Sequence, residues 1–175
     1  MLYKTNDSEL LKFGYEVYTK IKGKAKPVFL CVGSDKFVID CLAPIVAEKL
    51  KHKYNISAFV YGGLEYNVNR TNVVEVLRYI SVVHSDSSIV LIDATLDSEV
   101  GCVKVSNGAV VGLGNCLPNC KIGDLSILGV VGRRVAKIDL NSTRLRYIVD
   151  MAEFISKGCF LAVNRLEKEK SAVVS

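Results

Sequence analysis

Three aspartates follow apolar stretches that have the character of buried strands, and their carboxylates are the strongest chemical signal in the chain. Gly33-Ser34-Asp35 comes after one such stretch, with Asp40 a few residues further on, and Asp93 ends another stretch at residues 89–92. Two facing carboxylates can share a proton, so that one serves as base and the other as acid toward a water molecule. Carboxylate oxygens also bind cations, so a metal site is the alternative for the same residues.

Each aspartate also has a structural interpretation. Asp40 falls at or beside the start of a helix whose first turn contains Pro44, where an acidic side chain meets free backbone N–H groups. Asp35 fits a solvated turn. Asp93 is harder to explain in structural terms, because a carboxylate that closes an apolar strand must find polar partners or bear the cost of desolvation.

The other reactive side chains complete no recognisable site. Ser34 is near the aspartates, but neither His52, at an expected helix end, nor His84, before an expected strand, is placed to act as its base. Cys116 and Cys120 lack the further ligands that a zinc site needs. The leading expectation is therefore a site without cofactor or metal, in a protein whose six cysteines are free thiols.

Apolar periodicity predicts alternating helices and strands around the aspartates. A helix is expected over about residues 8–22, followed by strands at 28–32, 57–61 and 89–92 with helices between them. This order implies right-handed crossovers and a parallel sheet. Ligands bind such sheets beyond the carboxyl ends of the strands, where the strand order reverses. That point is expected between strands 28–32 and 89–92, where the three aspartates should converge.

The second half of the chain predicts a mixed continuation of this sheet. Asn107-Gly108 is a strong hairpin signal between short strands at 103–105 and 109–111. A glycine-rich loop then leads to a strand at Leu125–Val131, and Asn141-Ser142-Thr143 is expected to cap a last helix. The expected fold class is α/β, as a three-layer α/β/α sandwich with a mostly parallel mixed sheet.

Length and composition fit one domain over residues 1–175, with a core at about 27–163 and a polar C-terminal tail. Half of the residues are apolar and 23% are charged, which argues against disorder. The net charge of +5 is spread along the chain, so nucleic acid is not an expected partner. No apolar run is long enough for a bilayer and no export signal is evident, so a cytoplasmic protein is expected, with self-association left open.

The segments that carry the aspartates resemble a known family. Gly33-Ser34-Asp35 followed by Asp40-Cys-Leu-Ala-Pro44 resembles the pattern Gly-Thr-Asp and Gly-Asp-Ala/Ser-Leu-Gly-Pro of YyaC-type sporulation proteins, which are relatives of the spore germination protease. The segments 60–64, 90–94 and 122–127 agree with the same family. The resemblance covers about residues 27–163.

The resemblance implies the phosphorylase/hydrolase-like fold that is shared with hydrogenase-maturation peptidases. The resemblance also implies that Asp40 and Asp93 correspond to the paired catalytic aspartates of the germination protease. The neighbouring positions expected to contact substrate are Gly33, Ser34, Asp35, Asn72 and Asp124. It further implies a protein or peptide substrate, with small acid-soluble spore proteins as the suggested class, and a place in the forespore or spore interior.

Three functions would each use carboxylates at the carboxyl edge of the expected sheet, and the sequence does not decide among them. The first is a peptidase that uses Asp40 and Asp93 on a water molecule. The second is a non-catalytic peptide-binding or regulatory protein with the same fold. The third is a metal-dependent hydrolase that adds Asp35 as an oxygen ligand. The chain departs from the family pattern at Ala43, where glycine is usual, and at Asn69, where histidine is frequent.

Overall fold

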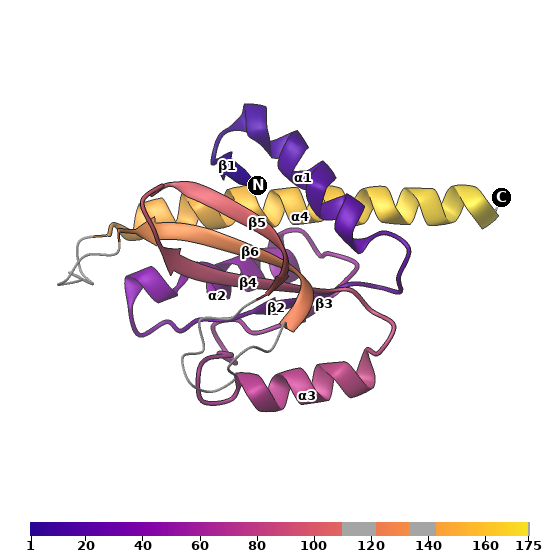
Figure 1. The fold of residues 1–175 in the computed structure, drawn as a ribbon, viewed down its shortest axis with the longest axis horizontal. Helices are drawn as coiled ribbons and strands as arrows, with labels where there is room; N and C mark the ends of the chain where they lie inside the picture. Colours follow the sequence, from indigo (N-terminus) through magenta and orange to yellow (C-terminus); the bar gives the residue numbers. More distant parts are fainter. Residues whose placement is uncertain (110–121, 134–142, 175) are drawn as a thin grey trace.

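The computed structural model describes residues 1–109, 122–133 and 143–174. These residues form one mixed sheet of six strands in the order β1-β5-β6-β4-β2-β3, with helices on both faces (Figure 1). The strands are β1 Leu2–Lys4, β2 Val28–Cys31, β3 Phe59–Tyr61, β4 Ile89–Leu96, β5 Cys102–Ala109 and β6 Ile122–Gly132. The helices are α1 Asp7–Ile21, α2 Leu42–Glu48, α3 Val73–Val83 and α4 Leu145–Val174, with a 3-10 helix at Val38–Asp40 before α2 and a π-helical turn at Lys49–Lys53 after it. The expected three-layer α/β/α sandwich is confirmed.

The strand order places a reversal beside β2. β2 lies between β3 and β4 and is parallel to both. The chain crosses from β2 through α2 to β3 on one side, and then from β3 through α3 to β4 on the other, so α2 and α3 pack on opposite faces of the sheet. β6 extends the parallel set beyond β4, while β5 is antiparallel to β6 and β1 is antiparallel to β5. The predicted reversal between strands 28–32 and 89–92 is confirmed.

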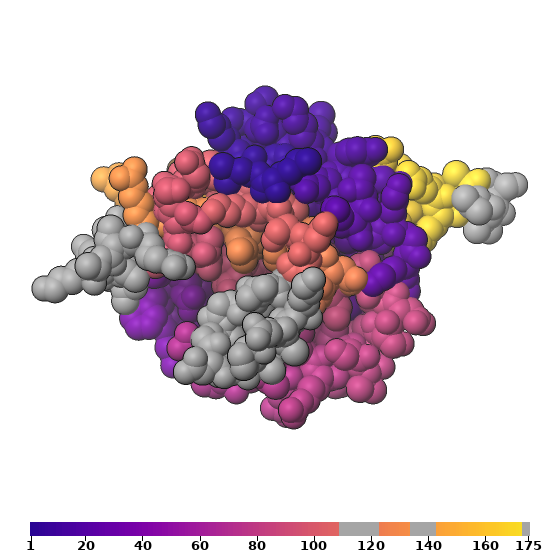
Figure 2. Space-filling model, in the orientation of Figure 1, coloured from indigo at the N-terminus to yellow at the C-terminus, as the bar shows by residue number. Residues whose placement is uncertain are grey.

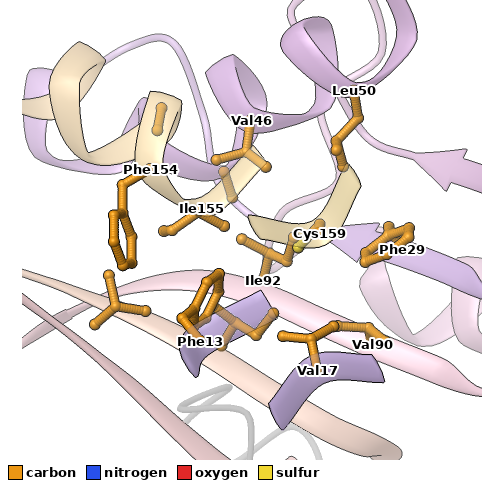
Figure 3. Packing of buried hydrophobic residues seen from close by; sticks show 14 of the residues in the cluster. Phe13, Val17, Phe29, Val46, Leu50, Val90, Ile92, Phe154, Ile155 and Cys159 are labelled. Carbon is orange, nitrogen blue, oxygen red and sulfur yellow. The ribbon is translucent and has the colours of Figure 1, made fainter. Parts of the chain in front are cut away.

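The larger apolar core lies between the sheet and helices α1, α2 and α4. Figure 3 shows Phe13 and Val17 of α1, Val46 of α2, and Phe154 and Ile155 of α4 gathered against the side chains of β2 and β4. A smaller core under α3 covers the other face, with Val28, Leu30, Val32, Val68, Val73, Leu77, Ile80 and Leu91. β2 is buried along its whole length, which explains its continuous apolar sequence.

Two glycines allow α1 and α4 to pack closely. A Cβ atom at Gly14 would lie 3.1 Å from the carbonyl oxygen of Gly158, and one at Gly158 would overlap the ring of Phe13. α4 extends through residues 164–174, the segment expected as a polar tail, and Leu166 there is still buried against the core. Within the described residues, no helix is both long and apolar enough to cross a membrane.

The predicted hairpin at Asn107-Gly108 is wrong. Both residues lie inside β5, which continues to Ala109 and pairs with β6, while residues 110 and 111 of the second predicted strand lie outside the described residues. The register between the two strands shifts between Asn107 and Ala109, and Gly108 has a φ of 68°. A type I′ turn and a glycine bulge both need a residue with a positive φ. The Asn-Gly pair therefore correctly indicated a positive φ at this point, but not that the chain reverses direction there.

Several boundaries also differ from the predictions. β1 is only three residues long, with Tyr3 alone buried, and such a segment carries no readable periodicity. β4 continues past Ile92 to Leu96 because β6 keeps pairing with it. Of the predicted helix cap at 141–143, the structure describes only Thr143, whose hydroxyl donates to the carbonyl oxygen of Val131 (3.3 Å). The glycine-rich segment up to residue 121 lies outside the described residues.

Candidate functional site

Asp93 lies at a step in the sheet, where one of its neighbours ends. β2 pairs with β4 up to Cys31 and Ile92, and the N–H of Val32 then donates to the carbonyl oxygen of Ile92 (2.8 Å). β4 itself continues, and Asp93 pairs with Leu128 of β6. Asp93 is therefore the first β4 residue beyond the end of β2, at the carboxyl edge and beside the strand reversal.

The loop after β2 turns back on itself and brings Asp40 to this edge. The N–H of Gly33 donates to the carbonyl oxygen of Val68 (2.8 Å), and the N–H of Ser34 donates to the carbonyl oxygen of Asp40 (3.1 Å). A Cβ atom at Gly33 would collide with the Asp40 carbonyl and would lie 2.8 Å from Cδ of Pro44. Only glycine allows this close approach, so the structure gives Gly33 a role in shaping the loop.

The carboxylate of Asp40 is not used as a helix cap. Asp40 ends the 3-10 helix, Cys41 is the N-cap residue of α2, and α2 has no side-chain capping hydrogen bond. Asp40 is partly buried, and no described residue donates a hydrogen bond to its carboxylate. Its charge is therefore not engaged in holding the described structure together.

The pKa values of both aspartates of the expected pair are raised, and the charge of Asp40 contributes to the rise at Asp93. Burial raises the pKa of Asp93 to about 7, the hydrogen bond from the N–H of Ala94 (2.7 Å) opposes this rise in pKa, and the negative charge of Asp40 adds to it. Burial also raises the pKa of Asp40 above its usual range. Near neutral pH the carboxyl of Asp93 can therefore hold a proton beside the carboxyl of Asp40.

Asp35 lies on the same loop and is exposed. Its carboxylate accepts a hydrogen bond from Nδ2 of Asn67 (2.9 Å), which ties the loop after β2 to the loop after β3. The pKa of the Cys41 thiol is raised by burial first and then by the charges of Asp35 and Asp40, so Cys41 lies close to both carboxylates and is a poor thiolate nucleophile. Oγ of Ser34 accepts from the N–H of Lys36 (3.2 Å) and serves the turn.

Asn72 serves the loop after β3 rather than an open site. Its Oδ1 accepts from the N–H of Asn69 (2.8 Å), and its Nδ2 donates to the carbonyl oxygen of Asn67 (3.0 Å). Both ends of the amide are thus engaged within the segment that leads into α3. The structure places Asn72 near the carboxyl edge but gives it a structural task there.

Asp124 is not brought to the site. It stands near the start of β6, where its carboxylate accepts from the N–H of Ile89 (2.9 Å) and from Nζ of Lys24 (2.6 Å). Ile89 begins β4 and Asp93 lies four residues later, so the two aspartates are separated by about 13 Å along the strand direction. Asp124 therefore lies at the amino edge of the sheet, opposite to Asp40 and Asp93.

Two side chains that hold the loop after β3 were not among the residues predicted from the sequence. Oε1 of Glu48 accepts from the N–H of Leu64 (2.9 Å), and Nζ of Lys51 donates to the carbonyl oxygen of Gly62 (2.7 Å). Gly62 has a φ of 94° and passes so close to the carbonyl of Cys31 that a Cβ atom would collide with it. The sequence signal available for this contact was the pair Gly62-Gly63, because it indicated a tight turn that side chains could stabilise.

The candidate site contains no evident metal centre in the part of the chain that the structure describes. No group of three or more His, Cys, Asp or Glu side chains there could hold an ion. His52 lies 3.3 Å from Oε2 of Glu48, and Nε2 of His84 is 2.7 Å from the hydroxyl of Tyr61, so each histidine is engaged elsewhere. The four described cysteines are free and buried: Cys31, Cys41, Cys102 and Cys159.

Comparisons with known proteins identify the family. The family model described as "Protein of unknown function (DUF1256)" matches residues 1–158. The protein titled "Uncharacterized protein YyaC" from Bacillus subtilis (strain 168) is 30% identical over 148 residues, which is 80% of this chain and 71% of that protein. The [NiFe] hydrogenase maturation protease HycI from Thermococcus kodakarensis KOD1 has a TM-score of 0.49 and 16% identity, covering 82% of this chain and 98% of that one. The chain therefore belongs to the DUF1256 family and is a YyaC-type protein, as its motifs at residues 33–44 suggested.

Proposed function

We propose that this chain is a peptidase that hydrolyses peptide bonds of spore proteins, with Asp40 and Asp93 acting as a pair on a water molecule. The observation that carries the proposal is the carboxyl of Asp93, whose pKa of about 7 results from burial at the end of β2, with Asp40 as the charged neighbour. A structural carboxylate is normally paired or solvated, and a strongly raised pKa in a partly buried carboxyl is typical of acid–base catalysis.

The two carboxyls divide the chemistry between them. Ionised Asp40 takes a proton from the water molecule as its oxygen attacks the carbonyl carbon of the peptide bond. Protonated Asp93 gives its proton to the amide nitrogen, so the C–N bond breaks and an acid and an amine leave. The proton that Asp40 gained then passes to Asp93, either directly or by release to solvent and uptake of a solvent proton by Asp93, which restores the starting pair. Activity requires the shared proton and should fall above about pH 7 as the pair loses it.

The substrate class rests on the resemblance to the spore germination protease. Small acid-soluble spore proteins are basic and helix-forming, and they provide a defined first substrate. The loop after β2 and the loop after β3 border the aspartates and are tied by the hydrogen bond from Asn67 to Asp35. We therefore assign the contact with the peptide to these two loops, and we leave Asp124 out of it.

The test is cleavage of such a spore protein by the purified chain, followed by mass spectrometry of the fragments. Asp40→Asn and Asp93→Asn should each reduce turnover by roughly a thousandfold or more, because the two carboxyls act as a unit. Asp86→Asn is the matched control, since Asp86 is exposed in the turn before β4, at the opposite edge of the sheet. Full activity in both site variants would refute the pair.

The same experiment separates the two competing functions. A non-catalytic peptide-binding protein would bind the spore protein without producing fragments at any pH. A metal-dependent hydrolase would lose activity on treatment with a chelator and regain it with a divalent cation, and Asp35→Asn would then be as damaging as Asp40→Asn. The proposed pair predicts turnover that survives the chelator and tolerates the change at Asp35 better than the change at Asp40.

A further inference from the structure

The first strand of the sheet has a free edge with unpaired backbone groups. β1 pairs only with β5, in the register Leu2 with Lys104, Tyr3 with Val103 and Lys4 with Cys102. The N–H of Val105 donates to the carbonyl oxygen of Met1 (2.8 Å). Because residues of an antiparallel pair alternate in bonding direction, Tyr3 also bonds toward β5, and Leu2 and Lys4 point their backbone groups away from it.

Most of these outward groups have no partner among the described residues. The carbonyl oxygen of Lys4 accepts from the N–H of Asn6 (2.9 Å). The N–H and carbonyl of Leu2 and the N–H of Lys4 remain open. An open edge of this kind is a template for another strand, and proteins that do not use it usually cover it or crowd it with charge.

Two hollows border β1. One of about 530 Å³ is lined by Met1, Tyr15 and Glu16, and one of about 440 Å³ is lined by Lys4 and Glu99. Leu2 borders both. Met1, Leu2 and Tyr15 are 79%, 45% and 53% exposed, which is high for side chains of this size. Figure 2 shows the indigo N-terminal segment at the surface of the molecule, in the upper part of the view.

We propose that this edge joins a second copy of the same chain, with β1 pairing antiparallel to the partner's β1 across a two-fold axis. Centring the pair on Tyr3 sets Leu2 opposite the partner's Lys4. The carbonyl of Leu2 can then accept from the N–H of Lys4, and the N–H of Leu2 can donate to the second lone pair of the Lys4 carbonyl, which already accepts from the N–H of Asn6. The sheet then continues from one subunit into the next, and the open apolar side chains beside β1 are covered.

The charges around the edge favour a second copy over a partner of one sign. Lys4 and Lys12 stand among Glu9, Glu16 and Glu99. A surface that carries both signs can face its own copy without strong like-charge repulsion, as an isologous two-fold contact requires. A strongly basic or strongly acidic partner would meet unfavourable charges at one half of the same surface.

The test is the mass of the chain in solution by sedimentation, measured across a wide range of concentration with no residues added before Met1. We expect a reversible dimer. Leu2→Pro removes the outward N–H and leaves the pairing with β5 intact, since proline is tolerated where an edge N–H faces solvent. Tyr15→Glu places a charge beside the contact. Both variants should be monomeric where the wild type is dimeric, and Val82→Glu, at an 80% exposed position on α3, should match the wild type.

Amide exchange provides a second readout that does not depend on the variants. The amides of Leu2 and Lys4 should become protected only at concentrations at which the dimer forms, while the amide of Val105 is protected throughout. A wild type that stays monomeric refutes the proposal. A dimer that survives both Leu2→Pro and Tyr15→Glu, or one whose Leu2 and Lys4 amides exchange as in the monomer, refutes it as well. Thermal melts verify that both variants are folded.

Discussion

Replacing Asp93 by asparagine should make the protein more stable while it removes the proposed activity. Asparagine has nearly the same shape, and its Oδ1 can still accept the hydrogen bond from the N–H of Ala94. What it lacks is a charge. Since burial raises the pKa of Asp93 to about 7, the ionised carboxylate is unfavourable in the folded state, and the neutral amide avoids that cost.

The size and the pH range of the effect follow from the two ionisation states. An ordinary aspartate ionises near pH 3.8, so between that pH and about 7 the folded chain holds a proton that the unfolded chain has lost. The unfolded state then binds fewer protons, and the stability of the wild type falls as the pH rises through this range. The full difference corresponds to about 4 kcal/mol. The rest of this difference has already developed below about pH 5, so we expect the advantage of Asp93→Asn to grow by about 2–3 kcal/mol between about pH 5 and about pH 8.

The assay is urea unfolding of the wild type and of Asp93→Asn at closely spaced pH values. The difference between the two proteins is compared, because it cancels the titration of the groups that do not interact with Asp93. Asp86→Asn, at an exposed site, should show a difference near zero that does not change with pH. A difference for Asp93→Asn that is flat across this range, or that shrinks as the pH rises, would refute the raised pKa and with it the assignment of the proton.

Three further predictions concern the core and its supports. Burial works to raise the pKa of Glu153, but hydrogen bonds from two lysines and a tyrosine lower it to about 2. Glu153→Gln should therefore lower the free energy of unfolding by about 1–2 kcal/mol at neutral pH. Urea titrations should show this loss fading as the pH falls from about 4.5 toward 2. Gly158→Ala should lower the melting temperature by roughly 5 °C or more, because the added methyl group overlaps the ring of Phe13. The fully buried thiols of Cys31 and Cys159 should react with a thiol reagent only at the rate of unfolding, and rapid labelling of the native protein would contradict their burial.

The sequence was sufficient for the topology near the site because the parallel strands there are buried on both faces. Val28–Cys31 and Ile89–Ile92 are continuous apolar runs, and the helices between them carry clear periodicity, so the crossovers and the strand reversal followed from general rules. The topology places Asp93 at that reversal, and the loop after β2 folds back and brings Asp40 to the same edge. The family motif at residues 33–44 pointed to the same place independently.

What the sequence could not provide depends on pairing between distant segments. Asp93 was expected at the end of a strand, but β4 continues because β6 still pairs with it after β2 has ended. Asp124 was expected to contact substrate because of the family resemblance, and only the register between β6 and β4 shows that it lies at the other edge. Asn107-Gly108 matched a hairpin by local preference, and the partner that turned it into a bulge is β6.

The stability cost of Asp93 bears on the choice among the candidate functions. A carboxylate that destabilises the fold near neutral pH contributes nothing to structure that asparagine would not contribute equally, since its one hydrogen bond, from Ala94, does not need a charge. A protein that only binds peptides through the two loops would gain stability by replacing it. The cost is understandable where the carboxyl must both hold and release a proton, which is the requirement for an acid–base pair with Asp40.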